Sequence, residues 1–112
     1  MAFANIYAGM KWDKTKIVKK DVFETPNLHF SMLLLEPGQS QASHTHEKSD
    51  KVLYVLEGVA TVTVGKDTQE LGQGACAMAL AGEHHALANK GRDRLIMLAV
   101  SAPPGHSSHK KA

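Results

Sequence analysis

The chain has 112 residues, enough for one hydrophobic core but not for two. Hydrophobic residues make up 43% and charged residues 21% of it, as in an ordinary globular domain. The net charge is only +2, and the basic residues are scattered. With one Trp, two Tyr and three Phe, the chain has no surface of interleaved basic and aromatic residues. Both observations argue against nucleic acid as a partner.

The cysteine content and the hydropathy of the chain bear on its compartment. Cys76 is the single cysteine, so no intramolecular disulfide can form, which fits a reducing compartment. The first residues, MAFANIYAGMKWDK, lack the basic and long apolar regions of a signal peptide, and no run approaches the about 18 apolar residues of a membrane helix. We therefore expect a cytoplasmic protein with no membrane partner.

Short apolar or alternating runs recur along the chain and are separated by turn residues, which predicts an all-β sandwich or barrel. In chain order, the predicted strands are residues 16–23, 29–36, 52–57, 59–64, 68–71, 75–80, 85–89 and 95–101. The GKD turn at 65–67 predicts a hairpin. Residues 1–27 are expected to add N-terminal strands to the same domain, 28–103 to form its core, and 104–112 to be a flexible tail.

Two of the predicted strands carry specific expectations about packing. VLYVLE at 52–57 is apolar at nearly every position, which predicts that a second sheet or a second subunit covers each face. A homodimer is therefore expected. In the run ACAMAL at 75–80, we expect Cys76 to be a buried small hydrophobe and Met78 to fill the core.

A pair of histidines, His44 and His46, precedes the 52–57 strand. Side chains two apart on a strand point to the same face, so both imidazoles could be directed at one metal ion. A third ligand would come from another strand, and His84 or His85 could supply it. By spacing alone, a metal site and two solvated loop histidines are about equally good interpretations.

The surroundings of these histidines resemble the two motifs of the cupin family. The first motif, G-x5-H-x-H-x(3,4)-E-x6-G, is matched by Gly38, His44, His46 and Gly58, and the second, G-x5-P-x-G-x2-H-x3-N, by Gly74, Gly82, His85 and Asn89. Leu80 stands in place of the proline of the second motif. The resemblance covers roughly residues 28 to 103 and implies a single antiparallel β-barrel of the jelly-roll type.

In cupins, three histidines and the glutamate of the first motif hold a divalent metal inside the barrel. The resemblance places these ligands at His44, His46, His85 and position 51, and leaves His84 facing outward or lining the mouth. The cofactor it implies is one divalent transition metal, namely iron, manganese, nickel, copper or zinc. Cupins also commonly form homodimers and bind small molecules.

Lys51 occupies the position of the metal-binding glutamate. A charged lysine about 5 Å from a dication would be repelled by about 6–7 kcal/mol at an effective dielectric constant of about 20. The sequence leaves four solutions open. A one-residue bulge could make Asp50 the fourth ligand and turn Lys51 outward, or the metal could have three histidine ligands only. Alternatively, Lys51 could face a bound anion as a catalytic residue, or the metal could be lost.

The function that we favour from the sequence is a metal-dependent enzyme acting on a small polar or anionic organic substrate. Three-histidine cupins include iron dioxygenases, so the resemblance favours dioxygenase chemistry slightly over isomerase or lyase chemistry. The alternative is a non-catalytic barrel that binds or senses a small ligand, with a structural metal or none.

Overall fold

The computed structural model describes residues 1–104, and the predicted tail lies almost wholly outside this range. The strands within it are β1 (Val18–Glu24), β2 (His29–Leu35), β3 (Ser40–His44), β4 (Asp50–Glu57), β5 (Ala60–Val64), β6 (Asp67–Leu71), β7 (Cys76–Ala79), β8 (His85–Ala88) and β9 (Leu95–Ala102). The described part of the chain contains no helix, and hence none that could cross a membrane. The all-β prediction is confirmed.

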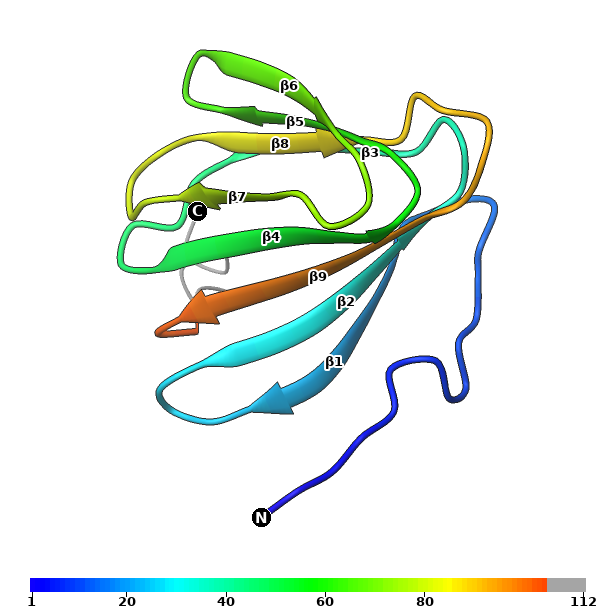
Figure 1. Ribbon diagram of the computed structural model, residues 1–112. Helices are drawn as coiled ribbons and strands as arrows, with labels where there is room; N and C mark the ends of the chain where they lie inside the picture. The colour runs from blue at the N-terminus through cyan, green and yellow to red at the C-terminus, as the bar shows by residue number, and fades with distance from the viewer. Residues whose placement is uncertain (105–112) are drawn as a thin grey trace.

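The strands form two antiparallel sheets that face each other in a jelly roll (Figure 1). One sheet has the order β1-β2-β9-β4-β7 and the other β3-β8-β5-β6. The predicted hairpin is present, because β5 pairs with β6 from Ala60–Leu71 to Val64–Asp67 around the turn. The sequence pattern did not predict β3 as a separate strand, because its residues, SQASH, lack apolar alternation.

The core lies between the two sheets and is built from alternate residues of each strand. In β4, Leu53 and Val55 are fully buried, whereas Val52 is 38% exposed. The main cluster of buried core residues consists of Leu33, Leu35, Leu53, Val55, Ala60, Val62, Leu87, Leu95, Met97 and Ala99. Side chains at the ends of these inward rows therefore face the interior of the barrel.

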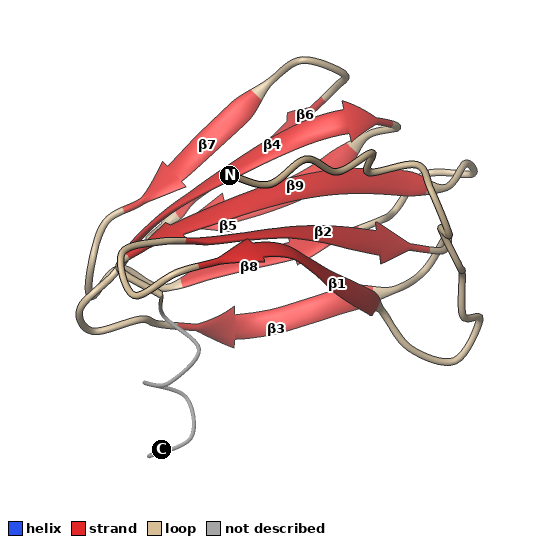
Figure 2. Ribbon diagram, turned by 90° about the horizontal axis from the view of Figure 1, so that it is seen from below, coloured by secondary structure: helices blue, strands red, loops and turns tan. Residues whose placement is uncertain are grey.

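The outer face of the five-stranded sheet is covered in part by the N-terminal segment of the same chain. Figure 2 shows this segment crossing the outside of the sheet, and Ile6, Met10 and Trp12 pack there in a second cluster around Met32 and its neighbours. The prediction that both faces of 52–57 are covered is thus only partly right. Leu56 contacts the N-terminal cluster, but the Val52 end remains exposed.

Two glycines of the cupin-like motifs adopt a positive φ in different surroundings. Gly38 has φ 90° and Gly58 has φ 94°. A Cβ on Gly58 would lie 2.6 Å from the carbonyl oxygen of Arg94, whereas a Cβ on Gly38 would meet nothing within 4 Å. Gly58 is therefore required both by its backbone angle and by the close approach of the loop before β9.

We expect Gly58→Ala to lower the free energy of unfolding by about 1–3 kcal/mol more than Gly38→Ala, because both carry the strain of a positive φ but only the first forces backbone atoms apart. Urea denaturation of the two variants measures this difference. Equal losses would mean that the contact with Arg94 relaxes without cost.

Candidate metal centre

Three histidines from different parts of the chain meet inside one end of the barrel. The possible ligand atoms of His44, His46 and His85 all lie within 4.8 Å of one another. Their ring centroids are 4.2 Å apart for His44 and His85, 5.0 Å for His44 and His46, and 5.3 Å for His46 and His85. A three-histidine group that could hold one metal ion is therefore present.

A register shift in β3 brings His44 into this group. Ser40 and Gln41 pair with Ala88 and Leu87, and continued pairing would place Ser43 opposite His85. The register shifts by one residue between Gln41 and His44, so that His44 pairs with His85 instead. Residues directly opposite in an antiparallel pair share one face, and the bulge thus directs both imidazoles inward.

His46 reaches the group from a loop. The expectation that His44 and His46 lie two apart on one strand is corrected, because β3 ends at His44. The carbonyl of His46 accepts a hydrogen bond from the Gly82 N–H at 2.9 Å, which ties this loop to the turn before β8. The tie holds His46 beside His85 and leaves it only 4% exposed.

The hydrogen bonds of two of the imidazoles suit metal binding. Nδ1 of His44 donates to the carbonyl of Ala42 at 3.1 Å, and Nδ1 of His85 faces the carbonyl of Glu83 at 3.5 Å. A carbonyl can only accept, so each Nδ1 carries the proton. Nε2 of His85 is buried and makes no hydrogen bond within residues 1–104. Metal-ligating histidines commonly bind through one nitrogen while the other donates to a carbonyl.

The surroundings of His44 and His85 keep these two imidazoles neutral. Burial, with smaller contributions from electrostatic interaction with His44 and Lys51, lowers the pKa of His85 to about 4. Burial also lowers the pKa of His44 from its ordinary value, with smaller contributions from Lys51 and Lys19. Neutral imidazole is the form that binds metal, so the donor set fits a divalent transition metal.

Of the two adjacent histidines considered as the third ligand, the structure brings only His85 to the group. His85 is the first residue of β8 and is 2% exposed. His84 is exposed, and its carbonyl accepts a hydrogen bond from Gly65 at 2.8 Å.

Lys51 points into the barrel. It shares the inward row of Leu53 and Val55 and is 7% exposed. Burial lowers the pKa of Lys51 to about 8, and the nearby charge of Lys19 contributes to the same shift. The ammonium influences the pKa of both His44 and His85, so it lies at the same end of the interior.

Asp50 is not brought to the histidines. It is exposed, and its Oδ1 accepts a hydrogen bond from the Ala81 N–H at 2.9 Å. The start of β4 pairs with β9 without a shift, from Asp50–Ala102 to Val52–Val100, so the bulge that would turn Asp50 inward is absent there.

The sequence pattern did not predict the structural roles of two polar residues near the site, Gln41 and Asn89. Gln41 lies opposite the core residue Leu87, and its buried Oε1 makes no hydrogen bond within the described range. Asn89 is predicted from the sequence only as a motif position. Its buried amide donates to the carbonyls of Leu35 and Asp93 at 3.0 and 2.9 Å and thereby ties β2 to the segments around β8.

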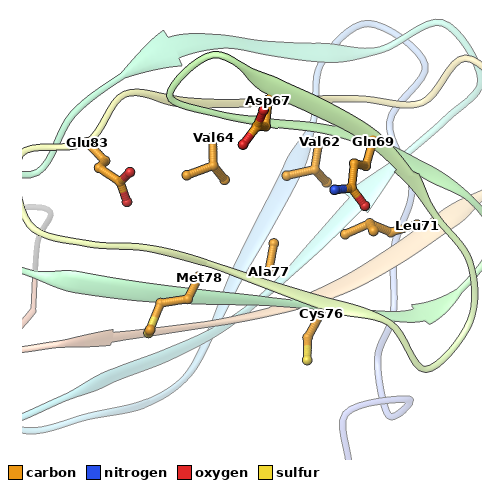
Figure 3. A pocket seen from close by; sticks show the side chains of 9 residues that line it. All are labelled: Val62, Val64, Asp67, Gln69, Leu71, Cys76, Ala77, Met78 and Glu83. Carbon is orange, nitrogen blue, oxygen red and sulfur yellow. The ribbon is translucent and has the colours of Figure 1, made fainter.

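A cavity of about 340 Å³ opens between β7 and the β5–β6 hairpin (Figure 3). Its lining residues are Val62, Val64, Asp67, Gln69, Leu71, Cys76, Ala77, Met78 and Glu83, so it does not include the three histidines. Ala77 points toward Val62, while the sulfur atoms of Cys76 and Met78 point the other way (Figure 3). Both residues are exposed, Met78 to 55%, and the prediction that they are buried is wrong because their side chains lie on the outer side of β7.

We expect Lys51→Met to raise the free energy of unfolding of metal-free protein at pH 7 by about 2 kcal/mol, because a buried charge is replaced by an apolar chain of similar length. The pKa of Lys51 in the folded protein, about 8, lies below the ordinary lysine pKa of 10.5, so the wild-type protein should gain stability as the pH rises between these values. The advantage of the variant should therefore shrink by pH 10.5.

Urea denaturation at the two pH values measures this, with the exposed Lys66→Met as the matched control. A destabilised Lys51→Met protein at pH 7 would show that the lysine makes a favourable contact in the folded state.

The chain matches a protein-family model and is similar to solved structures and to curated proteins. The Cupin domain model matches residues 31–101. The structure is similar to that of TT1209 from Thermus thermophilus, with a TM-score of 0.87 and 35% identity over 92% of this chain and 98% of that one. An uncharacterized protein of Streptomyces coelicolor is 30% identical over 78 residues, which is 70% of this chain and 72% of that protein.

A further relative is the tetracenomycin polyketide synthase protein TcmJ of Streptomyces glaucescens. It is 35% identical over 57 residues, which is 51% of this chain but only 38% of TcmJ. The family match covers most of the described chain and includes all three histidines. The chain belongs to the cupin family.

Proposed function

We propose that this protein is a metal-dependent enzyme that acts on a small polar or anionic organic molecule. His44, His46 and His85 would hold one divalent transition metal. The observation that carries the proposal is the convergence of three buried or half-buried imidazoles within 4.8 Å, with Nε2 of His85 buried and unpaired within residues 1–104. A buried acceptor without a donor is costly, and a metal ion would satisfy it.

A metal at this position would act as a Lewis acid that orients and polarises substrate oxygens. The chain itself contributes the neutral donor set and the surrounding charge. Three imidazoles leave the charge of a dication uncompensated, and Lys51 adds a further positive charge on the opposite wall. This excess favours an anionic substrate, and we lean toward dioxygenase chemistry, with isomerase and lyase chemistry also compatible.

A second candidate function is a non-catalytic barrel that binds or senses a small ligand. The inward position of Lys51 favours it, because a buried ammonium in the place of an acidic ligand weakens metal binding. In this case the barrel interior would hold the ligand, and a metal would be structural or absent. The two functions differ in whether the metal keeps an open coordination position.

We expect purified, tag-free protein to retain about one equivalent of metal after dialysis, and His44→Ala to lose it, because each imidazole contributes a ligand bond. Elemental analysis measures the content, with the exposed His84→Ala as the matched control. Iron would favour oxygenation, whereas zinc would favour an isomerase, a lyase or a structural site. Protein that stays empty after reconstitution would reject the enzyme in favour of the ligand-binding barrel.

We expect Asp50→Asn to keep the metal content of the wild type, because its carboxylate binds the Ala81 N–H at the surface. Elemental analysis of this variant, beside His44→Ala, checks the point. Loss of metal on this substitution would mean that the strand start rearranges and Asp50 serves as the fourth ligand.

The proposal also includes a cytoplasmic homodimer. The lone cysteine fits a reducing compartment. The exposed Val52, Met78 and Leu80 on the β4–β7 side support association between copies, because exposed apolar patches often mark interfaces. Sedimentation velocity at micromolar concentration tests the dimer, and a sharp monomer peak would reject it.

A further inference from the structure

A row of polar side chains crosses the inner face of the five-stranded sheet at one end. Lys51 of β4 pairs with Ser101 of β9, and Ser101 in turn pairs with His29 of β2. All three are buried, with exposures of 7%, 6% and 5%. The next inward positions along β4 and β9, Leu53 and Ala99, are apolar, whereas the next one along β2 is the buried Ser31.

This row lies at the same end of the barrel as the three histidines. Lys51 is at the start of β4, Ser101 near the end of β9, His44 at the end of β3 and His85 at the start of β8, and Figure 1 shows these strand ends together on one side. The two sheets face each other, so the polar row forms the wall opposite the imidazoles.

The ammonium of Lys51 has no counter-ion among the described residues. Within residues 1–104 it makes no hydrogen bond or ion pair, although the residue is only 7% exposed. Lys19 adds a second positive charge close enough to act on both Lys51 and His44. Asp21 of β1 is engaged elsewhere, because its Oδ1 contacts Nε2 of His29 at 2.7 Å. A buried, unpaired cation is costly, and binding an anion removes the cost.

We propose that Lys51 and Ser101 form an anion subsite that binds a carboxylate of the substrate, opposite the three histidines. This inference rests on the proposed function, which places a reacting part of the same substrate at the histidines. The ammonium supplies a charge-assisted hydrogen bond and the Ser101 hydroxyl a second donor. Lys51, which stands at the position of the acidic metal ligand of the family, would thus position the substrate and not the metal.

The charge of the subsite favours a carboxylate over a phosphate. One buried ammonium balances one negative charge, and the imidazole beside Ser101 is already held by Asp21. Phosphate groups are usually held by arginine forks, helix N-termini or several backbone N–H groups. Residues 1–104 contain no helix, and Arg94 is engaged with Glu36 at 3.1 Å and with the Trp12 ring.

The test is a titration of metal-free protein with propionate and, separately, with inorganic phosphate at constant ionic strength, followed by amide chemical shifts. Metal-free protein is used so that the probe cannot bind through a metal. Propionate should shift the amides around Lys51 and Ser101. Lys51→Met should weaken propionate binding at least about tenfold and Ser101→Ala about threefold, whereas the exposed Lys66→Met should leave it unchanged.

Wild-type protein that binds no propionate, or shifts at other amides, would overturn the subsite, as would a Lys51→Met protein with unchanged affinity. Phosphate bound more tightly at the same amides would overturn the assignment to a carboxylate. Should Lys51→Met not fold, Lys51→Gln and the location of the wild-type shifts decide the question.

Elemental analysis in parallel separates this inference from the proposed function. A protein that holds no metal but binds propionate at Lys51 would support the anion subsite and reject the proposed metal-dependent enzyme. A protein that holds metal but shows no carboxylate binding at Lys51 would support the proposed enzyme and reject the anion subsite.

Discussion

The apolar contact between the two sheets is the constraint on which the rest of the structure depends. Leu53, Val55 and Met97 from one sheet pack with Val62 and Leu87 from the other, and all are at most 3% exposed. Burial of such side chains contributes about 1.5–3 kcal/mol each and fixes the inward row of every strand. Because the inward row is fixed, a polar side chain at its end cannot turn to the solvent face without moving the apolar residues of the same strand out of the core. The buried positions of Lys51, His85 and Ser101 follow directly from this.

The interior of the barrel therefore has two regions. Its apolar region stabilises the fold, and its polar end does not. Three imidazoles occupy one wall of that end, and Lys51, Ser101 and His29 the other. Burial lowers the pKa of both His85 and Lys51, so positive charge is disfavoured at this end of the interior. Proteins retain such costs mainly at functional sites.

Family membership and local chemistry point to different conclusions at position 51. The three histidines agree with the metal site of the cupin family, while the lysine stands where that site has an acidic ligand. A glutamate there would lower the charge of a bound dication, whereas Lys51 raises the positive charge of the cavity. The difference therefore makes the interior less suited to a charge-neutralised metal and more attractive to an anion near Lys51.

The sequence by itself determined the all-β class, most strand positions and the two histidine motifs, because period-two alternation and motif spacing are local properties. It left open whether Lys51 faces inward or outward, which the unshifted pairing of the start of β4 with β9 decides. It could not place His44 opposite His85, which depends on a one-residue bulge in a polar strand paired with a segment about forty residues away. Nor could it predict that Cys76 and Met78 are exposed or that Asp50 lies at the surface, since these depend on which face of each strand the rest of the chain covers. Those features were decided by the tertiary structure, because register and the covering of a sheet face are properties of several segments and not of any one strand.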